Sequence, residues 1–140
     1  MSVGLEDGIF YHLTVSTVAV KAIIGDRCYP QILPPKVTLP AITLTRISGA
    51  REVIMAKQSG LAHPRIQINC WAATYAEAKA LAEEVRVSTD SFIGNMGTDV
   101  IKAVILQDED DVLEIAPQSE ANRRYGIRQD YEIWHEEPIT

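Results

Sequence analysis

The sequence predicts an α+β protein in which two helical segments pack on a mainly antiparallel β-sheet. Apolar residues recur at three- and four-residue steps in residues 5–24 and 74–92, as on the buried face of a helix. Apolar and polar residues alternate in residues 41–48, 65–71 and 125–135, as in strands with one buried face. Strands and helices do not alternate regularly along the chain, which argues against a parallel sheet.

The first helical segment, residues 5–24, is either one helix or two short ones. The polar residues Thr14, Ser16 and Thr17 interrupt its apolar pattern, and their hydroxyl groups favour a helix start near Thr17. Gly25 follows as a stop signal. Pro30 and three prolines within residues 31–40 then exclude a helix and predict a stiff surface crossing.

Two strands with clear alternation follow. Residues 41–48 alternate apolar residues with threonine, and a Ser-Gly-Ala turn predicts that residues 51–58 are their partner strand. Residues 65–71 place Ile66, Ile68 and Cys70 on one face, which we expect to be buried.

The second helical segment, residues 74–92, begins with the Thr-x-x-Glu spacing of a capping box, formed by Thr74 and Glu77. An apolar strand over residues 100–106 and a last strand over residues 125–135 complete the expected elements. Between these strands, residues 107–122 open with the densest acidic run of the chain and are expected to form a variable, solvated acidic loop.

The size and charge of the chain limit its function. A chain of 140 residues and 15.5 kDa fits one compact domain, residues 1–140. Thirteen basic and nineteen acidic residues give a net charge of −6, which argues against duplex DNA or an anionic membrane as an electrostatic partner. The N-terminus is acidic and lacks the pattern of a signal peptide, and no apolar run reaches the length of a membrane span.

Residues that usually carry chemistry do not form a known motif. Cys28 and Cys70 lack metal-site spacing and are expected to be reduced and buried, and His12, His63 and His135 are expected at the surface or in an interface. No nucleotide-binding or nucleophile motif occurs, so we expect no catalytic residue, cofactor or metal. The acidic run of Asp108, Glu109, Asp110 and Asp111 has no central glycine and is interrupted by Val112 and Leu113, which is unlike a calcium loop.

Two features stay open at this point. Trp71 and Trp134 lie out of phase with the apolar residues of their strands, so each packs on the second face of the sheet beneath a helix or belongs to a protein–protein surface. Residues 50–63 form either a plain hairpin or an arm that leaves the domain. The expected interface residues of this segment are Arg51, Val53, Ile54, Met55, Lys57 and His63.

Several stretches in order resemble one family. The first is Gly25-Asp26-Arg27-Cys28-Tyr29-Pro30, followed by Leu39-Pro40 and by a strand ending in Arg46-Ile47-Ser48-Gly49. Next come Ile66-Gln67-Ile68-Asn69-Cys70-Trp71-Ala72, Tyr75-Ala76-Glu77-Ala78 and Leu81-Ala82-Glu83-Glu84-Val85-Arg86. The last are Gln107-Asp108-Glu109-Asp110 and a strand ending in Trp134. This order and spacing resembles the tail completion, or tail terminator, proteins of long-tailed bacteriophages over residues 5–136.

The resemblance implies a structural protein with no active site, made in the host cytoplasm and carried in the virion at the head–tail interface. It implies a homo-hexameric ring at the head-proximal end of the tail, which stops growth of the tail tube and binds the connector or stopper protein. Genomic DNA passes through such a ring without specific binding, and a surplus of acidic residues favours that passage because carboxylates repel the DNA phosphates. We expect Asp108, Glu109, Asp110 and Asp111 on the lumen or axial face, and residues 50–63 on a neighbouring subunit or tail ring.

A second hypothesis comes from another class of protein. The acidic cluster, Asp108–Asp111 with a histidine, could serve a small soluble metal-dependent enzyme or accessory factor. The missing catalytic motifs weigh against it.

Overall fold

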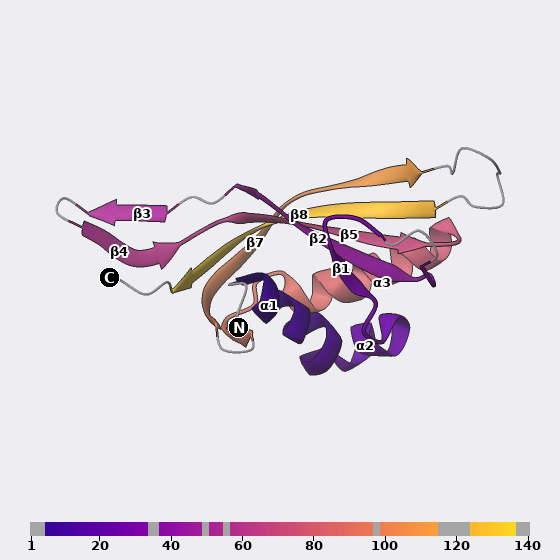
Figure 1. Ribbon diagram of the computed structural model, residues 1–140, viewed down its shortest axis with the longest axis horizontal. Coiled ribbons are helices and arrows are strands. Elements are labelled where there is room, and N and C mark those ends of the chain that lie inside the picture. The colour runs from indigo at the N-terminus through magenta and orange to yellow at the C-terminus, as the bar shows by residue number, and fades with distance from the viewer. Residues whose placement is uncertain are drawn as a thin grey trace.

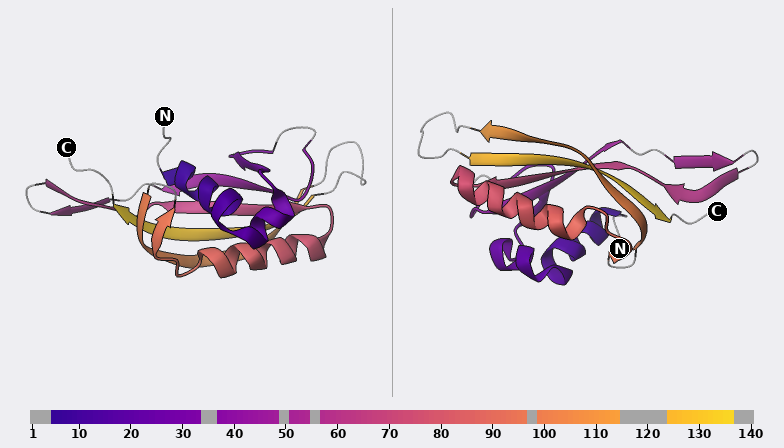
Figure 2. Two further views of the ribbon diagram at one scale, coloured as in Figure 1. Left: turned by 90° about the horizontal axis from the view of Figure 1, so that it is seen from below. Right: turned by 180° about the vertical axis from the view of Figure 1, so that it is seen from behind.

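The computed structural model describes residues 5–33, 37–48, 51–54, 57–96, 99–114 and 124–136. In this part of the chain, three helices and one π-helical turn lie against a single eight-stranded sheet. All three helices cover the same face of the sheet, and the opposite face carries no described helix (Figure 1; Figure 2, left). The α+β class is therefore confirmed.

The N-terminal segment is two short helices. Helix α1 (Leu5–Tyr11) runs into the π-helical turn η1 (His12–Ser16), and helix α2 (Val18–Ile24) follows after a bend of 89°. The hydroxyl of Thr14 donates to the carbonyl of Phe10 at 2.6 Å, and Thr17 adopts the extended conformation expected just before a helix. Gly25 ends α2 with a φ of 62°, a conformation that glycine adopts without strain.

The N-terminal helices also bear on the membrane prediction. Among the described residues no single helix is long and apolar enough to cross a membrane. Taken as a bent pair, Leu5–Ser16 and Val18–Ile24 reach that length and composition, and their inward residues, such as Ile9 and Ile24, belong to the core of the domain.

The sheet is mixed rather than purely antiparallel. The short strand β1 (Cys28–Pro30) pairs with β2 (Ala41–Ser48) in parallel, whereas every other described pairing is antiparallel. The strand order is β1-β2-β5-β8-β4-β3, and β7 lies on the other side of β8. The remaining strands are β3 (Arg51–Ile54), β4 (Lys57–Ala62), β5 (Arg65–Ala72), β6 (Gly94–Met96), β7 (Asp99–Glu114) and β8 (Arg124–Glu136).

The expected partner of β2 was wrong. Residues 51–58 do not fold back on β2; they form β3 and the start of β4, which pair with each other. Strand β2 instead pairs with β5, with Ile42 opposite Cys70 and Leu44 opposite Ile68. This register aligns the apolar residues of both strands on the face beneath the helices, so burial of that face decides the pairing.

Helix α3 (Tyr75–Thr89) confirms the second helical segment and its cap. The backbone amide of Glu77 donates to the hydroxyl oxygen of Thr74 at 3.2 Å, and that hydroxyl donates to the Glu77 carboxylate at 2.9 Å. The helix buries its inward stripe, including Leu81 and Val85, against β5 and β8.

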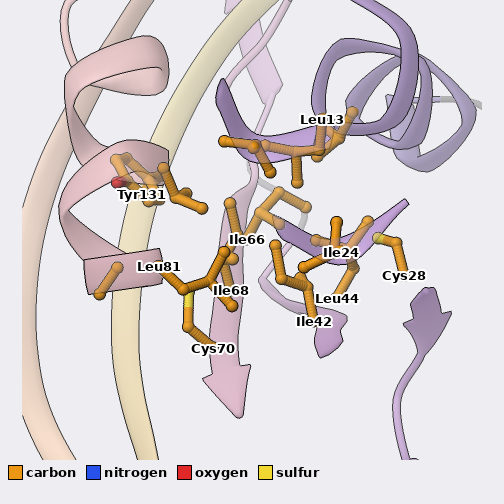
Figure 3. Close-up of a cluster of buried hydrophobic side chains, with 14 of the residues drawn as sticks. Leu13, Ile24, Cys28, Ile42, Leu44, Ile66, Ile68, Cys70, Leu81 and Tyr131 are labelled. Atoms are coloured by element: carbon orange, nitrogen blue, oxygen red, sulfur yellow. The ribbon is translucent and has the colours of Figure 1, made fainter. Parts of the chain in front are cut away.

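One hydrophobic core joins the helices to the sheet (Figure 3). Leu13 and Ile24 come down from the N-terminal helices and Leu81 from α3, and all three are fully buried. They meet a floor of inward side chains from β1, β2, β5 and β8: Cys28, Ile42, Leu44, Ile66, Ile68, Cys70, Ile127 and Tyr131. Burial of such side chains stabilises the fold by about 1.5–3 kcal/mol each.

Candidate functional site

A β-hairpin projects from one end of the molecule. Strands β3 and β4 extend beyond the helices and the rest of the sheet, at the side of the molecule opposite to the end of β7 and the start of β8 (Figure 1). Only Leu61 and Ala62 of this hairpin pair with the main sheet, opposite Glu136 and His135 of β8. Strands β3 and β4 thus form a hairpin that extends beyond the main sheet.

The predicted interface residues lie on this hairpin. Arg51, Val53 and Ile54 belong to β3 and Lys57 begins β4, whereas Met55 lies outside the described residues. The contacts that were expected of them with another protein stay a prediction.

His63, the last of these residues, fixes the base of the hairpin. Its ring stacks on Trp134 with centroids 4.0 Å apart and planes 13° apart. The His63 Nδ1 atom lies 3.3 Å from a carboxylate oxygen of Glu132, and the Trp134 indole N–H donates to the other carboxylate oxygen at 3.0 Å. The Ile133 amide donates to the carbonyl of Pro64 at 3.0 Å. These contacts hold the point at which the hairpin leaves β8.

The acidic run belongs to a strand, so the prediction of a loop beginning at residue 107 was wrong. Strand β7 continues through Asp108, Glu109, Asp110 and Asp111 to Glu114, paired with β8 all the way. Partners from distant segments hold the acidic residues in place. The guanidinium of Arg128 donates to Asp110 at 2.8 Å, the amide of Gln129 donates to Glu109 at 2.6 Å, and the hydroxyl of Tyr75 donates to Asp111 at 3.0 Å. Residues 115–122 lie outside the described residues.

Strand geometry divides the four acidic side chains between two faces. Glu109 and Asp111 contact residues on or beside α3 and so lie on the helix-covered face, whereas Asp108 and Asp110 point to the opposite face. In the described part of the chain no group of three or more His, Cys, Asp or Glu residues is placed to hold a metal ion. The divided carboxylates do not favour the hypothesis of a metal-dependent enzyme.

The helix-free face carries paired arginines and surplus acid. Where β5, β8 and the acidic part of β7 lie side by side, its charged residues are Arg65, Arg128, Asp108, Asp110, Asp130 and Glu132. Arg128 pairs with Asp110, and a guanidinium nitrogen of Arg65 lies 3.7 Å from a carboxylate oxygen of Asp130. Both arginines therefore have acidic partners; with Arg124 at the start of β8, which is in phase with Arg128, four carboxylates stand against three cations. This part of the face is a polar, net-negative surface.

Trp71 lies on the same face and is covered without a helix, so the expectation of packing beneath a helix was wrong. Its side chain is 8% exposed because the ring lies over Gly126 of the neighbouring strand β8. Its indole N–H donates to the hydroxyl of Thr43 at 3.2 Å. Gln31 and Ile32, in the segment after β1, line a small pocket with Trp71. Trp134 is likewise engaged within the chain, through His63.

Two of the three histidines are buried in the domain, contrary to the expectation of surface positions. His12 is 4% exposed, its Nε2 atom lies 3.1 Å from the Ser88 carbonyl oxygen, and its ring contacts Phe92 edge-on at 4.7 Å. Burial lowers the pKa of His12, and the bond to Ser88 partly opposes that shift. His135 is 6% exposed, at the end of β8. Both side chains belong to the packing of the fold.

The two cysteines are free and buried, as predicted. Burial raises the pKa of the Cys28 thiol to about 12. Burial also raises the pKa of Cys70, with smaller contributions from the nearby Glu109 and Cys28. Both thiols are therefore protonated at neutral pH and serve as small apolar side chains.

A buried polar chain was missed from the sequence. Gln129 is fully buried and its amide donates both to the Ala82 carbonyl of α3 at 2.9 Å and to Glu109, while its oxygen accepts from the Tyr131 hydroxyl at 2.9 Å. Burial raises the pKa of Tyr131, so the hydroxyl stays a donor. The available signal was a glutamine in phase with Ile127 and Tyr131 on an otherwise apolar face.

Comparisons with known proteins match most of the chain. The sequence model of the family described as "Tail completion protein gp17" matches residues 9–136. A chain of the solved structure "Virion of native gene transfer agent (GTA) particle" has the same fold with a TM-score of 0.62 at 14% identity, and the match covers 96% of this chain and 99% of that chain. No curated protein matches the sequence.

Proposed function

Because this chain belongs to the tail completion protein family and is a structural protein of the phage virion, we propose that it closes the head-proximal end of the tail. In this proposal, residues 1–140 act as one domain, and six copies form a homo-hexameric ring. The ring stops growth of the tail tube, binds the connector or stopper protein of the head, and lets genomic DNA pass. The match of the family model to residues 9–136 carries the proposal. The function is geometric and requires no catalysis.

The hairpin supports a role in assembly. It projects from the domain and pairs with the main sheet at only two described residues, which supports the proposal that it crosses to a neighbouring subunit or tail ring. An isolated two-stranded hairpin is only marginally stable in water, which favours a partner that covers it.

The helix-free face supports passage of DNA. A lumen that attracted phosphates through free arginines would hold DNA by releasing its counterions. Here Arg65 and Arg128 are both paired with carboxylates, and acid is in surplus. We therefore propose that this face, with Asp108 and Asp110, is directed to the lumen, and that Glu109 and Asp111 lie behind it against α3.

Removal of the protein tests the function as a whole. A phage whose gene for this chain carries an early stop codon should yield filled heads and unjoined tails of uncontrolled length, and the intact gene supplied in trans should restore virions. Particle images and tail-length distributions measure both effects. Tails of normal length joined to heads in the absence of the chain would refute the proposal. Quantitative mass spectrometry of virions should give six copies for each particle.

Two variants test its parts. Asp108→Lys should leave virions assembled but slow DNA delivery, whereas Asp26→Lys, the same charge change in the exposed turn after α2, should not. Equal DNA delivery by both variants would refute the proposal that Asp108 faces the lumen.

A chain that lacks residues 51–62 should fold but fail to cap tails. Unchanged infectivity of that phage would refute a role of the hairpin in assembly.

A further inference from the structure

The β3–β4 hairpin joins the rest of the sheet across a break in strand pairing. Strand β5 pairs with β8 over its whole length, whereas β4 pairs with β8 at two described residues, Leu61 and Ala62. His63 and Pro64 separate β4 from β5 and belong to neither strand. Proline has no N–H to donate, and within the described backbone one hydrogen bond, from the Ile133 amide to the Pro64 carbonyl, crosses this interval. Few backbone bonds therefore fix the angle between the hairpin and the sheet.

Side chains on the helix-free face bridge the break. His63, directly after β4, lies flat on Trp134 of β8, and its side chain is 17% exposed. Both rings contact Glu132, since the His63 Nδ1 atom lies 3.3 Å from one carboxylate oxygen and the Trp134 indole donates to the other. A stacked ring pair stabilises a contact by more than its buried area alone. The hairpin is thus held to β8 largely by this pair of rings.

We infer that the break is a hinge and that His63 and Trp134 are positioning residues, whose stack sets the direction in which the hairpin leaves the domain. The inference rests on the proposed function, in which the hairpin crosses to a neighbouring subunit or tail ring, and it names what aims the hairpin. A segment that is already fixed in its binding direction loses less conformational entropy when it binds. Loss of the stack therefore weakens assembly through the angle of the hairpin.

Hydrogen exchange of the purified full chain tests the hinge. In Trp134→Ala the amides of residues 51–54 and 57–62 should exchange about five- to tenfold faster, as expected for loss of one aromatic contact, whereas those of β5 should keep the parent rate. Trp134→Phe keeps a ring against His63, so its hairpin should exchange within about twofold of the parent rate. The matched control Trp71→Ala removes the other tryptophan of this face and should not accelerate the hairpin more than β5.

A double variant tests whether the two rings act as one contact. His63→Ala should accelerate exchange in the hairpin as much as Trp134→Ala does, and the double variant should exchange no faster than either, because each single change already breaks the stack. Multiplied effects in the double variant would refute the stack as the common cause. Unchanged hairpin exchange in both single variants, or equal acceleration in β5, would refute the hinge.

Tail assembly tests the positioning role. Phage with Trp134→Ala should form about tenfold fewer capped tails although the chain is folded, and Trp134→Phe should recover most of that yield. Fast hairpin exchange with a normal yield of capped tails would refute the positioning role, and so would equal losses in Trp134→Phe and Trp134→Ala. Failure of the proposed function is a different outcome, because tails would then be joined and of normal length when the whole chain is absent.

Discussion

Gly126 is the residue whose replacement tests the packing of the helix-free face most directly. A Cβ atom added there would lie 2.8 Å from Cζ3 and 2.9 Å from Cε3 of Trp71, whereas ordinary contact begins near 3.4 Å. In Gly126→Ala the indole must therefore move by about 0.6 Å, which also stretches its 3.2 Å bond to Thr43. Overpacking of this kind costs about 1–3 kcal/mol.

A net loss of about 2 kcal/mol in the free energy of unfolding is expected for Gly126→Ala, after the smaller backbone entropy of alanine in the unfolded chain is allowed for. For a domain of this size that corresponds to a fall of about 6 °C in Tm. Urea unfolding followed by far-ultraviolet circular dichroism measures the loss without relying on tryptophan fluorescence.

The Trp71→Ala background is the control. With the indole removed, Gly126→Ala should cost nothing or stabilise the protein by about 0.4–1 kcal/mol, because the added methyl group meets open space. An equal loss in both backgrounds would show that the ring over Gly126 is not the cause. A Gly126→Ala protein as stable as the parent would refute the packing argument.

Three further predictions concern the described core and helix α3. Thr74→Ala should lower the free energy of unfolding by about 1 kcal/mol through loss of the bond to the Glu77 amide, and an unchanged urea midpoint would contradict this. The pKa of His12 is lower in the folded state than in the unfolded chain. The contribution of neutral His12 to the free energy of unfolding is therefore full above about pH 6.5, the ordinary value, and is lost as the pH falls and the unfolded chain takes up a proton. His12→Gln should therefore flatten the dependence of Tm on pH between pH 7.5 and 5.5, and parallel curves for both proteins would oppose it. The Cys28 and Cys70 thiols should resist maleimide at pH 8 until urea unfolds the protein; rapid labelling of the native protein would contradict their burial.

Local patterns predicted the elements whose determinants are local. The spacing of Thr74 and Glu77 gave the start of α3, and alternation gave the inward faces of β2 and β5, because capping and strand burial depend on residues a few positions apart. The interruption by Thr14 and Thr17 likewise marked the bend between α1 and α2.

Strand pairing and the secondary structure of the acidic run could not be predicted from local sequence patterns. The acidic residues suggested a loop because aspartate is rare in strands. Strand β7 continues there because Arg128 and Gln129 of β8 donate hydrogen bonds to its carboxylates across the ladder. The residues next to Asp110 in the sequence do not predict those partners. A small apolar groove between α1 and β1 was missed for the same reason, since its lining joins Phe10 with Tyr29 and Leu44 from separate elements.

The acidic part of β7 also affects how the free subunit behaves before it is incorporated. Strand β6 pairs with β7 only as far as Ile101, and beyond Gln107 the outer edge of β7 has no described strand beside it. Open sheet edges invite the same edge of another molecule, which leads to amyloid-like aggregation. Two β7 edges brought together would oppose carboxylate to carboxylate on both faces. The acidic residues that we propose to face the passing DNA are thus also expected to oppose edge-to-edge aggregation of the free subunit.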